Sequence, residues 1–150
     1  MRVFRLTKRK YAGDLSGKGA ALSNNRWNSK GTEILYTADS RALAMAEVMV
    51  HLTMYMLPDD YMMMEIDIPV GVSIAQTDIV DVSGFQWPAS IETQRAGDAL
   101  IRSGETCVLK VPSAVVKGDF NYLINPAHSD AKKIRIIETV PFPFDRRVFK

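Results

Sequence analysis

The chain has 150 residues, 47% of them hydrophobic, and a formal net charge of +2. A chain of this length can bury one core but is too short for two domains of ordinary size, so a single domain over residues 1–150 is expected. No apolar run is long enough to span a membrane, and charged residues stand where a signal peptide needs its apolar centre. A cytoplasmic protein is therefore expected.

The few cysteines and histidines exclude several kinds of site. Cys107 is the only cysteine, which excludes a disulfide framework and any multi-cysteine metal site. Its strand-like surroundings, TCVLKV, favour an inert buried thiol over a nucleophile. The two histidines, His51 and His128, argue against a catalytic metal site. No metal is expected.

The basic residues gather towards both ends of the chain. Residues 1–30 hold eight Lys and Arg against one acid, residues 131–150 hold six against two, and the hundred residues between hold five against fourteen. Such ends could contact nucleic acid, line a pocket for a phosphorylated small molecule, or form a solvated surface. No nucleic-acid-binding motif accompanies them, and the three alternatives stay open.

The first half of the chain is expected to hold two strands and a helix. An alternating strand, a loop rich in Gly, Ser and Asn, and a second strand are predicted at VFRLTK (3–8), residues 12–31 and EILYTA (33–38). A helix capped by Asp39 or Ser40 is expected to run to about Leu57. Pro58 lies just beyond its end.

The second half is expected to add one helix and several strands. A strand pattern interrupted at Pro69, a helix and three further extended segments are predicted at residues 61–74, 90–102, 106–112, 121–126 and 132–142. Strands separated by two helices, without a regular βαβ rhythm, indicate an α+β domain with a mostly antiparallel sheet.

The first predicted helix carries a single acid, Glu47. Apolar residues occupy both of its sides: Leu43, Val50 and Met54 share a stripe with Glu47, and Met45, Met49, Leu52 and Met56 form the other side. The helix is therefore expected to be buried, with its methionines as core filler. An unpartnered buried carboxylate is costly, so Glu47 must be paired, protonated or turned towards a cavity. An internal arginine, His51 or a narrow exposed edge could each satisfy it.

Blocks along nearly the whole chain resemble the RES-domain family, the toxin half of bacterial RES–Xre toxin–antitoxin pairs. In the family's order they are RWN-x-x-G (26–31), LYTA (35–38), A-x-x-E-x-x-x-H-L (44–52), GD (97–98), VPSAVV (111–116), N-x-L-I-NP-x-H (121–128) and FDRR (144–147). The arginine, glutamate and serine that give the family its name map to Arg26, Glu47 and Ser113. Asn25 departs from a common glycine, and residues 99–100 replace a more usual tryptophan-containing stretch.

The resemblance implies a fold similar to ADP-ribosyltransferase toxins, with a mostly antiparallel sheet core flanked by helices. It implies a growth-arresting toxin that cleaves the nicotinamide–ribose bond of NAD+ by hydrolysis or phosphorolysis, with NAD+ as substrate and no bound cofactor. It also implies an Xre-type antitoxin that occludes the active site and makes the only link to DNA, in a complex that could hold a homo-oligomer of the toxin. The alternative is transfer of ADP-ribose to a protein side chain. A third interpretation is a non-catalytic nucleic-acid or protein-binding module with basic ends.

One carboxylate suits this chemistry. Nicotinamide leaves as a neutral molecule, so the barrier lies in a ribose cation that a nearby anion stabilises. Glu47 is the expected anion, and the guanidinium of Arg26 suits the pyrophosphate. Tyr36 is expected to stack on nicotinamide or to bond near the ribose, unless it belongs to the core. Ser113 is expected to orient the nicotinamide amide or Glu47.

Four further residues have weaker assignments. Arg5 is expected to assist Arg26 at the phosphates, unless it is a surface charge. Asn121 and Asn125 are expected either to contact the substrate or to hold backbone turns, and turns are favoured next to Pro126. Trp27 is expected to pack in the core.

Overall fold

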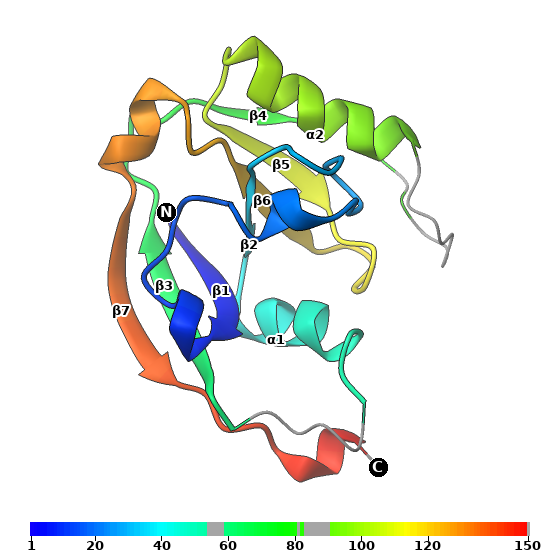
Figure 1. Cartoon of the computed structure of the whole chain (residues 1–150), viewed down its shortest axis with the longest axis vertical. Helices are drawn as coiled ribbons and strands as arrows, with labels where there is room; N and C mark the ends of the chain where they lie inside the picture. The colour runs from blue at the N-terminus through cyan, green and yellow to red at the C-terminus, as the bar shows by residue number, and fades with distance from the viewer. Residues whose placement is uncertain (54–58, 81, 83–90, 150) are drawn as a thin grey trace.

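The computed structural model describes residues 1–53, 59–80, 82 and 91–149. Seven strands form one sheet in the order β4-β5-β6-β2-β1-β3-β7 (Figure 1). Their bounds are β1 (Arg2–Lys8), β2 (Leu35–Ala38), β3 (Tyr61–Asp67), β4 (Ile74–Gln76), β5 (Val108–Pro112), β6 (Phe120–Ile124) and β7 (Arg135–Pro141). Every neighbouring pair is antiparallel except β4 with β5. The expected α+β class with a mostly antiparallel sheet is confirmed.

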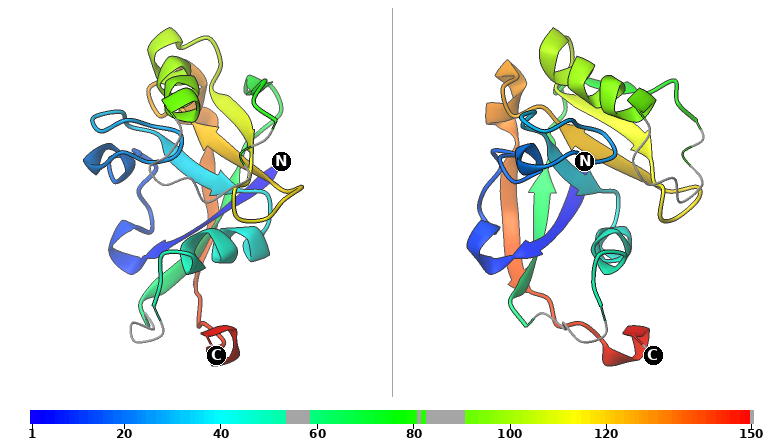
Figure 2. Two further views of the ribbon diagram at one scale, coloured as in Figure 1. Left: turned by 90° about the vertical axis from the view of Figure 1, so that its right-hand side faces the viewer. Right: turned by 45° about the vertical axis from the view of Figure 1, so that its right-hand side comes forward.

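Two α-helices and several short 3₁₀ turns complete the described structure. They are α1 (Arg41–Met49), α2 (Ile91–Ser103), η1 (Arg9–Tyr11), η2 (Ala20–Leu22), η3 (Ser129–Lys133) and η4 (Arg146–Phe149). Figure 2 shows α1 and α2 on the same side of the sheet. In the described part of the chain, no helix combines the length and the hydropathy that crossing a bilayer requires.

The pairing between β1 and β2, in the middle of the sheet, is very short. Strands β1 and β2 share a single aligned pair, Phe4 with Ala38, whereas β1 and β3 are aligned along their whole length. The sheet therefore has two halves, β4-β5-β6-β2 and β1-β3-β7, joined at this short contact. Helix α1 packs against both strands of the junction. Helix α1 begins three residues after the end of β2, so the side chains on the side of α1 that faces the sheet lie near the point where the two halves meet.

The alternation along the strands sorts side chains onto two faces. The face that packs against α1 and α2, here called the helix face, carries Phe4, Leu6, Tyr36, Ala38, Leu109, Val111 and Leu123. The opposite face, here called the back face, carries Val3, Leu35, Met64, Ile66, Val108, Tyr122 and Ile124. Two layers of core therefore lie on the two sides of the sheet, and a residue's parity along its strand decides which layer it joins.

Helix α1 begins where predicted but ends early. The Ser40 hydroxyl accepts a hydrogen bond from the amide of Leu43 at 3.0 Å, which caps the first turn. The helix stops at Met49, and the next amides, His51 and Leu52, bond back three residues, the tight turn that commonly closes a helix. The prediction of helix as far as Leu57 is wrong for residues 50–53, and residues 54–58 lie outside the described part.

Helix α1 is also less buried than its composition predicts. Only Leu43 and Ala44 are fully buried, and Val50 is 51% exposed. One side of the helix packs on β1 and β2, while the flanks carry Met45 and Val48 only partly covered. The expectation of a helix enclosed on all sides is wrong, because the sheet covers one side and the described chain does not cover the rest.

The alternating stretch 61–74 makes two separate strands. Strand β3 ends at Asp67, and the chain turns through Pro69 and Gly71, whose φ of +99° suits glycine. Strand β4 then pairs in parallel with β5 at the far edge of the sheet. The period of two continues across the turn, so periodicity identifies the strands without showing that they lie in different halves of the sheet.

Candidate active site

Glu47 projects from α1 onto two neutral hydrogen-bond donors. Its Oε1 accepts from the hydroxyl of Ser113 at 2.7 Å and from Nδ2 of Asn121 at 2.7 Å. Within the described residues, no cation forms an ion pair with Glu47. Its partners are thus neither an internal arginine nor His51, which is exposed. The carboxylate is fixed by donors that leave its charge uncompensated.

Ser113 comes immediately after β5, which ends at Pro112. Its hydroxyl oxygen accepts from the amides of Val115 and Val116, at 3.1 and 3.0 Å, and donates to Glu47. A hydroxyl has one donor and two acceptor positions, so all three are used. Of the two contacts expected for Ser113, the structure contains the one with Glu47.

Asn121 in β6 and Asn125 just after it have different surroundings. Asn121 lies inside the strand, opposite Ala38 of β2 and Val111 of β5, and shares the helix face with Leu123. Asn125 is four residues further on, about 13 Å along the chain at the usual strand rise. Its Oδ1 accepts from the amide of Ala127 at 2.9 Å, which holds a turn. The structure brings Asn121 to Glu47 and does not bring Asn125 there.

Tyr36 uses its hydroxyl to hold the loop that contains Arg26. The hydroxyl donates to Oδ1 of Asn28 at 2.6 Å and accepts from the amide of Trp27 at 3.2 Å. Burial is the main cause that raises the pKa of Tyr36 far above its ordinary value, so the hydroxyl stays neutral and keeps its proton to donate. The ring, on the helix face, is the part of Tyr36 left to contact a substrate.

Asn28 holds this loop together and was not among the residues singled out from the sequence. It is fully buried, and its Nδ2 donates to the carbonyl of Ala20 at 2.9 Å and of Ser29 at 3.1 Å. Since its Oδ1 accepts from Tyr36, one side chain joins the loop to β2. The only sequence signal for this role is its position in the RWN block. Trp27, beside it, is 2% exposed and packs in the core, as expected.

Helix α2 supports the same loop from behind. The Thr93 hydroxyl donates to the carbonyl of Arg26 at 2.5 Å. Asp98 accepts from both the amide and the hydroxyl of Ser29, at 3.0 and 2.6 Å. Asn25, which departs from the family's glycine, fits without strain, because no described non-glycine residue has a positive φ. The backbone at Arg26 and at Ser29 is therefore held by side chains of α2.

The two candidate arginines lie in different places. Arg26 is half-buried, and its positive charge offsets a small part of the rise that burial causes in the pKa of Tyr36. It forms no ion pair within the described residues. Arg5 alternates with Phe4 and Leu6 and therefore lies on the back face, where it donates to the carbonyl of Tyr36 at 3.2 Å. Burial lowers the pKa of Arg5. This position does not support the expected role of Arg5 at the phosphates and makes it a support for β2.

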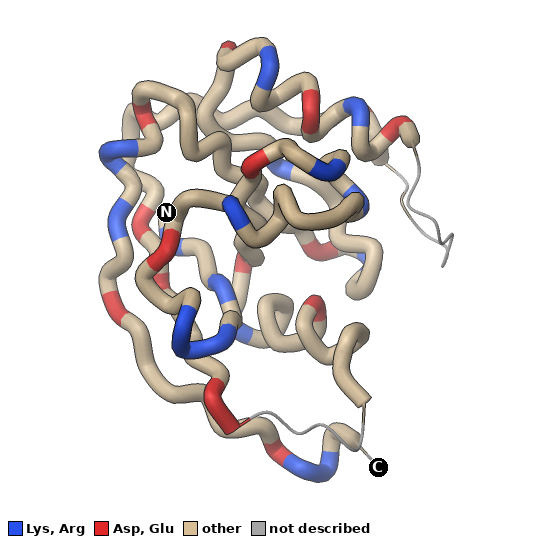
Figure 3. The backbone as a smooth tube through the Cα atoms, in the orientation of Figure 1, with Lys and Arg blue, Asp and Glu red and all other residues tan. Residues whose placement is uncertain are grey.

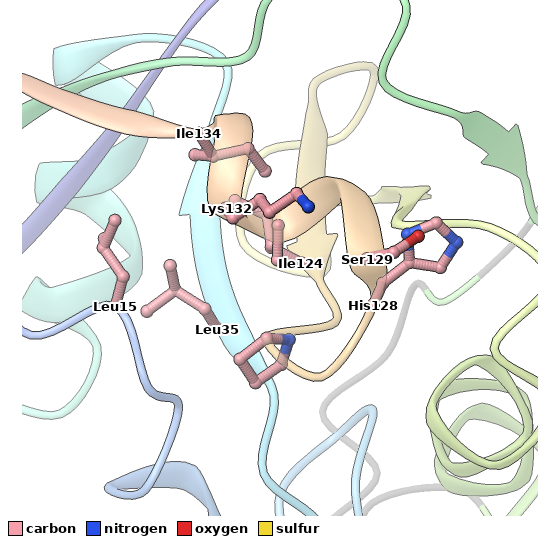
Figure 4. A pocket seen from close by; sticks show the side chains of 9 residues that line it. Leu15, Leu35, Ile124, His128, Ser129, Lys132 and Ile134 are labelled. Atoms are coloured by element: carbon pink, nitrogen blue, oxygen red, sulfur yellow. The ribbon is translucent and has the colours of Figure 1, made fainter.

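Two cavities are separate from the Glu47 site. One, of about 340 Å³, lies on the back face, with Leu35 and Ile124 among its lining residues and His128 and Lys132 at its side (Figure 4). The other, of about 520 Å³, lies between the turn at residues 29–33 and α2. Neither is lined by Glu47, Tyr36 or Arg26. The candidate site is therefore defined by the side chains that converge on Glu47.

Cys107 is expected to be chemically inert in the native protein. It is completely buried, and burial raises the pKa of its thiol to about 11, so about one molecule in 10⁴ carries a thiolate at pH 7. A chromogenic disulfide reagent should fail to label native protein at pH 7 and should label it fully in denaturant. Rapid labelling of the native protein at the same pH would contradict this expectation.

Comparison with known proteins identifies the family. The sequence model of the RES domain matches residues 2–145. A protein of Sphingobium sp. (strain YBL2) named "Prs ADP-ribosylating toxin" is 37% identical over 143 residues, which cover 93% of this chain and 89% of that protein. "Toxin Res" of Photorhabdus laumondii is 34% identical over 157 residues, covering 100% and 98%.

A solved structure shows the same fold. A chain in the crystal structure of the M. tuberculosis MbcT-MbcA toxin-antitoxin complex superimposes with a TM-score of 0.71 at 19% identity, covering 99% of this chain and 86% of that one. The match extends over both halves of the sheet. Together with the match of the family's sequence model over residues 2–145, it leads to one conclusion: the chain belongs to the RES domain family.

Proposed function

We propose that this protein is a toxin that cleaves the nicotinamide–ribose bond of NAD+, with water or phosphate as acceptor. The observation that carries the proposal is the carboxylate of Glu47, held at 2.7 Å by two neutral donors and joined to no cation within the described residues. Relatives named as toxins, one of them as an ADP-ribosylating toxin, support it.

Glu47 would act on the ribose. As the bond from C1′ to the pyridinium nitrogen breaks, its electron pair leaves with neutral nicotinamide and positive charge develops at C1′. Two neutral donors fix the carboxylate without cancelling its charge, so it can stabilise that cation and accept a hydrogen bond from the 2′-hydroxyl. Water or phosphate then adds to C1′ and gives up a proton. NAD+ is the substrate, and no cofactor is required.

Arg26 and Tyr36 would hold the rest of the dinucleotide. The loop that bears Arg26 is tied to β2 through the Tyr36 hydroxyl and to α2 through Thr93. Its guanidinium, without an acid partner in the described residues, suits a pyrophosphate oxygen pair. The ring of Tyr36 offers an aromatic face to the nicotinamide. In this proposal Arg26 binds the pyrophosphate, Tyr36 contacts the nicotinamide and Glu47 acts on the ribose.

A protein acceptor is the second candidate function. Transfer of ADP-ribose to a side chain shares the whole bond-breaking step, and the relative named "Prs ADP-ribosylating toxin" favours it. A non-catalytic nucleic-acid module is less well supported: in Figure 3, the lysines and arginines are spread over elements at the top, middle and bottom of the molecule.

We also propose a protein inhibitor as partner. An enzyme that destroys NAD+ inside its own cell needs restraint, and the similar fold comes from a toxin-antitoxin complex. An Xre-type antitoxin that covers Glu47 and Arg26 would provide it, and the protein would then act in the cytoplasm, where NAD+ is present. Contact with DNA would then run through the antitoxin.

Incubation of pure protein with NAD+, with and without phosphate, tests the proposal. Mass spectrometry should detect nicotinamide together with ADP-ribose for hydrolysis, or ADP-ribose 1″-phosphate for phosphorolysis. A gain of one ADP-ribose on a protein, in the presence of cell extract, would identify a transferase. Absence of nicotinamide under all three conditions would overturn the proposed function.

A further inference from the structure

We propose that Asn121 is a positioning residue: its amide, together with Ser113, holds one oxygen of Glu47 and so directs the other oxygen to the ribose. The proposal deepens the function above and rests on it. Asn121 is half-buried and lies on the helix face of β6, where most of its described neighbours are apolar. Its neighbour on the same face of β6 is the fully buried Leu123.

Apart from its contact with Glu47, Asn121 has apolar neighbours in the sheet. The residues opposite it in the ladder are Ala38 and Val111, which are 2% and 0% exposed. Its Oδ1 is buried and accepts no hydrogen bond from the described residues. An unsatisfied buried acceptor destabilises a protein, and an aliphatic side chain here would avoid that cost. Packing therefore gives no reason for an asparagine, whereas the N–H donated to Glu47 does.

The register of the strands brings Asn121 to Glu47. Ala38, opposite Asn121, is the last residue of β2, and α1 starts three residues later. The small Ala38 side chain leaves room beside the amide. The end of β5 and the start of β6 come close to this helix, so Glu47 meets a donor from each: Ser113 just after β5 and Asn121 inside β6.

Two donors on one oxygen fix the carboxylate more completely than one donor does. The terminal torsion of a glutamate is broad and roughly two-fold, so a carboxylate held at one point can still rotate. With Oε1 bonded from two directions, rotation breaks at least one bond. Oε2 receives no hydrogen bond from the described residues. It is therefore the oxygen offered to the ribose.

The chemical type of the donor matters as well. Arginine or lysine at this position would hold the carboxylate but also neutralise the charge that the ribose cation needs. A second carboxylate would repel it. An asparagine supplies an N–H without charge and is anchored by the backbone ladder of β6 on both sides.

Replacement of Asn121 by leucine separates positioning from structure. Asn121→Leu keeps the number and branching of the side-chain heavy atoms and removes the N–H together with the unsatisfied acceptor. Loss of the hydrogen bond to Glu47 and removal of the unsatisfied acceptor act in opposite directions on stability, so the melting temperature should change by only a few degrees. We expect kcat for nicotinamide release to fall by about 10- to 100-fold, the scale of a misplacement of about 1 Å, with KM for NAD+ changed by less than about 2-fold. Asn121→Ala is the second variant if leucine does not fit.

A double-mutant cycle completes the test. In a Glu47→Gln background, Asn121→Leu should have no further effect on residual turnover, because the carboxylate it positions is gone. A raised KM with unchanged kcat would assign Asn121 to the substrate instead and overturn the proposal, as would additive effects in the cycle. Lack of turnover by the wild type would overturn the proposed function alone. In that case the same four proteins are compared by their free energies of unfolding, and a coupling energy of zero between residues 47 and 121 overturns the inference.

Discussion

Glu47→Gln is expected to lower kcat for nicotinamide release by about 10³-fold. Glutamine keeps the shape of glutamate, and its carbonyl oxygen can still accept from Ser113 and Asn121, which hold Oε1 in the native protein. The substitution removes the negative charge that faces the ribose cation and places an NH2 group where Oε2 would accept from the 2′-hydroxyl. Because that charge acts in the transition state and the phosphates bind elsewhere, KM for NAD+ should change little.

The measurement is release of nicotinamide at saturating NAD+, with the melting temperature of each variant recorded alongside. Glu138→Gln, at an exposed position on β7, is the matched control because it makes the same chemical change outside the site, and it should keep wild-type turnover. A Glu47→Gln protein that folds and keeps more than about a tenth of kcat would remove Glu47 from the catalytic role.

Local sequence signals predicted the elements well. The Ser40 cap, the alternation of β1 and the short strand before α1 depend on neighbours in sequence, and each is confirmed. The length of α1 was not predictable, since an apolar composition says nothing about where the turn at Val50 closes the helix. The break near Pro69 was predicted, but the placement of β4 at the far edge of the sheet was not, because partners in a sheet are chosen over long distances and the period of two does not identify them.

The site was predictable only in part. The resemblance singled out Glu47 and Ser113, and the structure brings them within hydrogen-bonding distance. Asn121 was assigned more readily to a turn, because its contact with Glu47 joins residues 74 positions apart and no local pattern encodes it. Arg5 was placed with the site on charge alone, whereas its parity on β1 puts it on the back face. Topology, more than residue type, decides which polar side chains meet.

Gly97→Ala is expected to break the contact between α2 and the loop that holds Arg26. We expect the free energy of unfolding to fall by about 3 kcal/mol and the melting temperature to fall by about 10 °C. A Cβ at Gly97 would lie 1.6 Å from the carbonyl oxygen of Trp27 and 2.7 Å from its carbon. Both atoms belong to the backbone, so neither can rotate away. Helix α2 must withdraw from the loop, which breaks the bond from Thr93 to the Arg26 carbonyl.

The direction of the change in melting temperature distinguishes a clash with the loop from the ordinary helix propensity of alanine. In an isolated helix, alanine in place of glycine stabilises by about 1 kcal/mol, so a higher melting temperature for Gly97→Ala would show that α2 does not press on the loop. Gly19→Ala is the matched control, because a Cβ there meets nothing within 4 Å and the backbone φ is −61°. Its melting temperature should stay close to that of the wild type. If Gly97→Ala folds at reduced stability, its turnover should fall mainly through a higher KM for NAD+, because Arg26 loses its position while Glu47, on the other helix, keeps its donors.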